Sequence, residues 1–161
     1  MSVVFSSLAG YFLAAEKISF GSILLLFFGG YFMVGASNTF NQLIEREKDG
    51  IMERTLNRPL PKNRINTSQA LSIGILLSIL GVIFLYFLNI KTALFGAISI
   101  LLYVVIYTPL KRITPLSVFV GAIPGAIPYM LGWVAYTGSF GIEPGVLFLL
   151  QFFGNFLTFG L

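Results

Sequence analysis

Long apolar runs are the sequence feature that most restricts what this chain can fold into. Most of them approach or exceed the ~20 residues that an α-helix needs to cross the hydrocarbon core of a bilayer. The sequence therefore predicts an all-α polytopic transmembrane bundle with about six spans. The six runs are Met1–Ala15, Ile18–Ile44, Thr67–Leu88, Thr92–Leu110, Pro115–Thr137 and Ile142–Leu161.

The composition supports this fold class and removes several kinds of site. Of the 161 residues, 57% are hydrophobic and 10% are charged, whereas a soluble domain carries about 25% charged residues. The chain has no cysteine, which excludes disulfides and thiolate metal sites. It also has no histidine, the commonest acid–base and haem-ligating side chain.

The basic residues mark alternate connections between the apolar runs. Eight of the ten Lys and Arg residues lie in two connections, Glu45–Asn66 and Lys111–Thr114, and the other three connections are nearly uncharged. If each run crosses the bilayer once, both basic connections lie on one side. The positive-inside rule places these connections and the N-terminus in the cytoplasm, in a bacterial-type inner membrane. The net charge of +4 is thus a topology signal and requires no nucleic-acid partner.

Three oxygen-bearing side chains follow one helical face at the end of the second run. Asn41, Glu45 and Asp49 are each four residues apart, so on a helix they stack at intervals of ~6 Å. Oxygen ligands of this kind suit Mg²⁺, which keeps several waters and bridges to phosphate oxygens. An amide such as Asn41 at the end of an apolar span also needs a partner. The alternative is a solvated interfacial face with ordinary ion pairs.

Basic side chains follow these acids closely. Arg54 and Arg58 are again four residues apart, and Lys62 and Arg64 come after them. Carboxylates for a metal beside guanidinium groups for phosphate oxygens are what a diphosphate leaving group requires. The alternative function of such a cytoplasmic basic connection is to set topology or to contact lipid headgroups.

Three sequence stretches resemble one known family. The Asn41-x3-Glu45-x3-Asp49 pattern, followed by Met52–Leu60, resembles the first aspartate-rich motif of the UbiA-type prenyltransferases. The central Glu and the Met-x-Arg-Thr-x-x-Arg-Pro-Leu run are similar to the haem o synthase (protoheme IX farnesyltransferase) branch. So are Tyr107–Arg112 and Gly121–Pro128, except that Tyr129 stands where that branch has a second Pro.

The resemblance implies a function and a set of site residues. The expected reaction is transfer of a farnesyl group from farnesyl diphosphate to a vinyl group of protoheme IX, which gives haem o; haem is then a substrate and Mg²⁺ the cofactor. Asn41, Glu45 and Asp49 are expected to hold Mg²⁺, partly through water. The diphosphate-binding residues are expected to be Arg54, Arg58, Lys62, Lys111 and Arg112.

The resemblance also suggests roles for apolar positions. An allylic cation could be shielded by cation–π contact with aromatic side chains, although each of these is also a candidate for simple packing. Gly121 and Gly125 are expected to permit close helix approach, and Pro124 and Pro128 to bend the helix and free carbonyl groups. The candidate aromatic residues are Phe40, Tyr103, Tyr107 and Trp133.

Two rival functions remain at this point. One is a UbiA-type enzyme for another acceptor, such as a quinone precursor or chlorophyllide, against which Tyr107–Arg112 argues. The other is a non-catalytic membrane fragment that binds lipid or a partner.

The two ends of the sequence raise a separate expectation. After Phe153 the family pattern continues Trp-Gln-Phe-Pro-His, whereas this chain reads Gly154–Leu161. Deleting one base from a plausible coding sequence for the family peptide produces these eight residues and a stop codon. We therefore expect a single domain over residues 1–161 that is incomplete at its C-terminus, lacks the second aspartate-rich motif and is inactive alone. The short first run suggests missing N-terminal residues as well.

Overall fold

The computed structural model describes residues 2–46, 51, 53, 66–111 and 113–160. Over these residues the chain is helical and contains no strand, which confirms the predicted all-α class. In chain order the elements are α1 (Ser2–Ala14), α2 (Phe20–Ile44), α4 (Thr67–Tyr86), α5 (Ile90–Leu101), η1 (Leu102–Tyr107), α6 (Thr108–Leu110), α7 (Ser117–Thr137) and α8 (Ile142–Gly160).

Side-chain caps set where several helices begin. Asn66 forms a capping box with Gln69: each side-chain oxygen accepts from the other residue's backbone N–H, at 2.7 and 3.1 Å. Asn89 caps α5 by accepting from the Thr92 N–H at 2.8 Å. Because of this cap, α5 begins at Ile90 rather than at the predicted Thr92. An N-cap oxygen satisfies a backbone donor that the first helical turn leaves open.

Four helices of the described residues are long and apolar enough to cross a membrane. They are Phe20–Ile44, Thr67–Tyr86, the continuous stretch Ile90–Leu110, and Ser117–Thr137, whereas the apolar helices Val3–Ala14 and Ile142–Thr158 are shorter. Their outward side chains include exposed Phe28, Leu76 and Ile79. A surface this apolar is suited to lipid rather than water, so the chain is an integral membrane protein.

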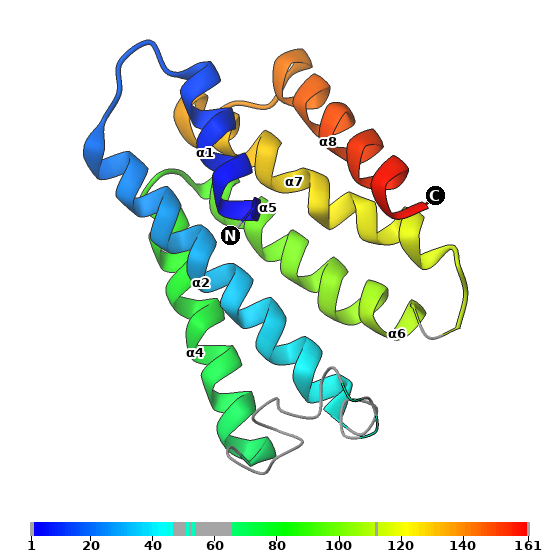
Figure 1. The fold of residues 1–161 in the computed structure, drawn as a ribbon. Coiled ribbons are helices and arrows are strands. Elements are labelled where there is room, and N and C mark those ends of the chain that lie inside the picture. Colours follow the sequence, from blue (N-terminus) through cyan, green and yellow to red (C-terminus); the bar gives the residue numbers. More distant parts are fainter. Residues whose placement is uncertain (1, 47–50, 52, 54–65, 112, 161) are drawn as a thin grey trace.

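Five of the helices form a ring. α2 packs against α4 and α1, α4 packs against α5, and α7 packs against both α5 and α1. α8 packs on the outside of α7 (Figure 1). The buried side chains that meet between these helices include Tyr11, Leu26, Leu85 and Leu131.

The positions of the helix ends show at which end of the bundle each connection lies. At one end the Tyr136 hydroxyl accepts from the Glu16 N–H at 3.0 Å, and the Asn89 amide donates to the Val134 carbonyl at 3.0 Å. The end of α2, the end of α6 and the start of α4 all lie at the other end (Figure 1). The two basic connections therefore leave the bundle at the same end, as predicted.

Helix α7 meets its neighbours through small residues and freed carbonyl groups. A Cβ atom on Gly132 would overlap the carbonyl oxygen of Ser7 in α1. Gly121 lies against the Tyr107 ring, and Gly125 against the amide of Asn155, which confirms that both glycines permit close approach. Since Pro128 has no N–H, the carbonyl of residue 124 loses its helical donor, and it accepts instead from the Ser99 hydroxyl at 3.3 Å.

Candidate functional site

Two of the three predicted metal ligands lie together at the end of α2. Asn41 is in the last turn of α2, and Glu45 caps the helix with its backbone N–H bonded to the Asn41 carbonyl oxygen. The Lys111 ammonium, just after α6, lies 3.0 Å from Glu45 Oε1 and donates to Asn41 Oδ1 at 3.3 Å. The Glu45 side chain is only 9% exposed. Asn41 and Glu45, which precede Lys111 by 70 and 66 positions, thus direct two oxygens at one cationic group.

A threonine supports this cluster from the facing helix. The Thr108 hydroxyl lies 2.9 Å from the Tyr103 carbonyl oxygen and 3.3 Å from Asn41 Oδ1, and the residue is fully buried. Thr108 follows the π-helical segment η1, and its backbone N–H bonds the same Tyr103 carbonyl, five residues back. Short π segments are frequent at functional sites. Sequence reasoning assigned Thr108 no role, although it stands three residues before Lys111.

Two neighbouring tyrosine rings, tilted by 35°, lie between the cluster and the interior. The Lys111 ammonium lies 5.6 Å from the centre of the Tyr107 ring, within the range of a cation–π contact. The Tyr107 ring in turn lies 5.3 Å from the Tyr103 ring. A positive charge near this end of the bundle would therefore face two aromatic rings.

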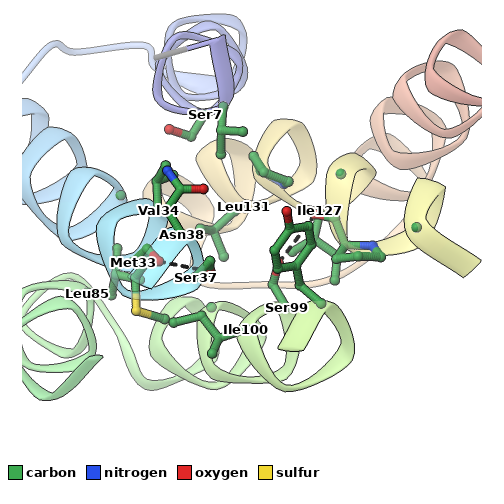
Figure 2. A pocket seen from close by; sticks show the side chains of 18 residues that line it. Ser7, Met33, Val34, Ser37, Asn38, Leu85, Ser99, Ile100, Ile127 and Leu131 are labelled. Carbon is green, nitrogen blue, oxygen red and sulfur yellow. Dashed lines mark hydrogen bonds between the residues drawn. The ribbon is translucent and has the colours of Figure 1, made fainter. Parts of the chain in front are cut away.

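An apolar cavity of about 210 Å³ opens on the other side of Tyr103. Its walls come from α1, α2, α4, α5, η1 and α7, and they include Met33, Leu85, Ile127 and Leu131 (Figure 2). Of the four aromatic residues singled out in the sequence, Tyr103 lines this cavity and Phe40, Tyr107 and Trp133 do not. Phe40 packs instead against Gly74 of α4.

The oxygen donors of the cluster suit Mg²⁺ in their chemistry. Asn41 Oδ1 and Glu45 Oε1 are hard oxygen donors that already face one cation, the Lys111 ammonium, and Mg²⁺ prefers such donors. Among the residues that the structure describes, no group of three or more acidic, His or Cys side chains gathers. The predicted third ligand, Asp49, lies outside those residues, as do Arg54, Arg58, Lys62 and Arg112.

Comparison with known proteins gives consistent matches over almost the whole chain. The model of the UbiA prenyltransferase family matches residues 3–160. A protoheme IX farnesyltransferase of Christiangramia forsetii is 62% identical over 159 residues, which are 99% of this chain and 53% of that protein. One from Flavobacterium psychrophilum is 57% identical over 162 residues, covering 99% and 54%. The chain thus spans about half the length of these curated relatives.

Solved structures show the same helical arrangement. A structure described as digeranylgeranylglyceryl phosphate synthase superposes with a TM-score of 0.83 at 23% identity, over 96% of this chain and 54% of that one. The apo structure of a UbiA homologue from Aeropyrum pernix superposes with a TM-score of 0.73 at 20% identity, over 93% and 55%. At this identity the likeness concerns the fold alone.

Proposed function

The chain belongs to the UbiA prenyltransferase family, and from this premise we propose that it is part of a protoheme IX farnesyltransferase. The reaction is transfer of a farnesyl group from farnesyl diphosphate to a vinyl group of protoheme IX, which gives haem o. The observation that carries the proposal is the convergence of Asn41 Oδ1 and Glu45 Oε1 on one cation, beside an apolar cavity. Such a site suits a ligand with a diphosphate head and a hydrocarbon chain.

The polar cluster binds the diphosphate head. Asn41, Glu45 and Asp49 would hold Mg²⁺, partly through water, and the ion would supply positive charge against the departing diphosphate. Lys111 supplies a further positive charge, since its ammonium already lies at the two oxygens. The other proposed phosphate contacts are Arg54, Arg58, Lys62 and Arg112.

The cavity and its tyrosine wall shelter the reacting carbon. When the bond between the first prenyl carbon and the diphosphate oxygen breaks, its electron pair stays on that oxygen and an allylic cation remains. The Tyr103 ring lines the cavity, and the Tyr107 ring lies next to it, so both can stabilise this cation by cation–π contact. The vinyl π electrons then form the new C–C bond, and the resulting cation loses a proton or captures water. Protoheme IX is consumed as a substrate.

A chimeric enzyme tests the proposed reaction. We expect residues 3–153 of this chain, placed in the corresponding segment of the Christiangramia forsetii relative, to support conversion of haem b to haem o in membranes containing farnesyl diphosphate and Mg²⁺. The product is identified by mass spectrometry of extracted haems. The parent relative serves as the control. If the chimera inserts into the membrane and prenylates a quinone precursor but makes no haem o, the acceptor is a quinone precursor and not protoheme IX.

The proposed topology puts the diphosphate site in the cytoplasm. The two basic connections leave the bundle at the same end, which by the positive-inside rule faces the cytoplasm of a bacterial-type inner membrane, with the outer faces of the helices against membrane lipid. The N-terminus belongs to the same side in this proposal.

Single cysteines test this orientation cleanly because the chain has none of its own. We expect Asn66→Cys and Ile113→Cys to react with an impermeant maleimide only after inverted vesicles expose the cytoplasmic face. Ile18→Cys and Ser139→Cys, at the opposite end, should react in intact cells. All four positions are exposed. Labelling of Ile113→Cys from outside would show that the topology is inverted.

A further inference from the structure

One polar side chain in the cavity has no partner. Asn38 of α2 lies among the lining residues (Figure 2), and its carboxamide forms no hydrogen bond with any part of the chain that the structure describes. The serine hydroxyls of the same lining are already bonded to carbonyl oxygens. Ser7 donates to Val4 at 2.7 Å, Ser37 to Met33 at 3.0 Å and Ser99 to Pro124 at 3.3 Å.

The side chain of Asn38 is exposed in the structure and lines the cavity, so its amide faces open space rather than a protein partner. Asn38 precedes the end of α2 at Ile44 by six residues, which is ~9 Å along a helix axis. An amide inside a membrane-spanning segment is expensive without a hydrogen-bonding partner and commonly marks a substrate pathway. The amide therefore points to a ligand with a polar atom at this level of the cavity.

The position relative to Asn41 identifies that atom. Asn38 precedes Asn41 by three residues, ~4.5 Å along the axis on a neighbouring part of the same face. Asn41 belongs to the polar cluster with Glu45 and Lys111, whereas Asn38 lines the apolar cavity. A prenyl diphosphate that places its head in the cluster and its chain in the cavity has its ester linkage between the two.

From this geometry we infer that Asn38 donates a hydrogen bond from Nδ2 to the oxygen that joins the diphosphate to the first prenyl carbon. This inference rests on the proposed function. When the C–O bond breaks, the electron pair and one unit of negative charge collect on the departing diphosphate, and the allyl group becomes the cation. A neutral amide donor fixed at that oxygen stabilises the developing charge without moving.

Paired ligands test this role in the chain itself, reconstituted in lipid nanodiscs with Mg²⁺ and without haem. Farnesyl diphosphate carries the ester oxygen and inorganic pyrophosphate does not. We expect Asn38→Leu to weaken farnesyl diphosphate binding roughly 10-fold, the usual scale for losing a hydrogen bond to a charged group, and to change pyrophosphate binding less than about twofold. Asn38→Asp keeps the size but loses the donor and adds a negative charge, so it should weaken farnesyl diphosphate binding further.

A matched amide provides the control. Gln42 lies one turn beyond Asn38 on α2 and does not line the cavity, so Gln42→Leu should leave both affinities unchanged. If Asn38→Leu lowered the affinities for farnesyl diphosphate and pyrophosphate equally, or lowered neither, the inference would be overturned while the proposed function stands. Failure of the unsubstituted chain to bind either ligand with Mg²⁺ would overturn the proposed function and this inference with it.

Discussion

Gly132→Ala is expected to destabilise the bundle by about 3 kcal/mol, at the upper end of the usual cost of overpacking. A Cβ atom at this position would overlap the Ser7 carbonyl oxygen and lie 2.6 Å from the Tyr11 backbone nitrogen. Both atoms belong to the backbone of α1, so no side-chain rotation relieves the clash. A Cβ on Gly10 of α1 would likewise overlap the Tyr129 carbonyl oxygen of α7. The two helices cross with each glycine facing the other backbone, and they must separate to admit a methyl group.

A second glycine of the same bundle provides the control for this prediction. Gly145 lies in α8, where an added Cβ has no atom within 4 Å. Gly145→Ala should therefore be neutral or slightly stabilising, because alanine restricts the unfolded chain more than glycine does. Both variants can be compared by denaturant titration in detergent micelles. Equal unfolding midpoints would mean that α1 and α7 do not cross as closely as the structure has them.

The helices and their order were predictable because each depends on local sequence. An apolar run of about 20 residues has few alternatives to a membrane helix. The alternation of basic and weakly charged connections then indicates which helix ends lie on the same side of the membrane. The structure differs from the prediction in two respects. Of the six predicted spans, two form described helices that are shorter than a span, Val3–Ala14 and Ile142–Thr158, and the Asn89 cap starts α5 at Ile90 rather than at Thr92.

The contacts between distant segments were less accessible to sequence reasoning. Spacing places Asn41 and Glu45 on one helical face, but only the packing of α2 near α6 brings Lys111 to both. The motif containing Tyr107 suggested a phosphate-binding Lys111 and gave no sign that Thr108 supports Asn41. Likewise, Asn38 is one polar residue among several in α2 until the cavity is known. The roles of Asp49, Arg54, Arg58, Lys62 and Arg112 stay predictions.

Glu45→Gln is expected to weaken Mg²⁺-dependent binding of both farnesyl diphosphate and pyrophosphate by about 100-fold, a loss comparable with the larger effects of altering a metal's surroundings. The substitution keeps the size of the side chain and one acceptor oxygen, so α2 and its contact with α6 should persist. It removes the negative charge that attracts a divalent cation to Asn41. Equilibrium dialysis with Mn²⁺ in place of Mg²⁺ measures the metal directly. Glu143→Gln, in the first turn of α8, provides a carboxylate control that should bind as the unsubstituted chain does.

Lys111→Met separates the metal from the diphosphate in the same assay. The ammonium lies 3.0 Å from Glu45 Oε1 and 3.3 Å from Asn41 Oδ1, so it occupies the position that a metal bound to both oxygens would take. Removing it should leave Mn²⁺ affinity unchanged or raise it, because the ion no longer competes with a tethered cation for the two oxygens. Diphosphate affinity should fall, because one positive charge is lost. Glu45→Gln lowers both affinities, whereas Lys111→Met lowers the diphosphate affinity without lowering the Mn²⁺ affinity. If Lys111→Met lowered Mn²⁺ affinity as strongly as Glu45→Gln, the ion pair would serve to hold Glu45 in place rather than to bind phosphate.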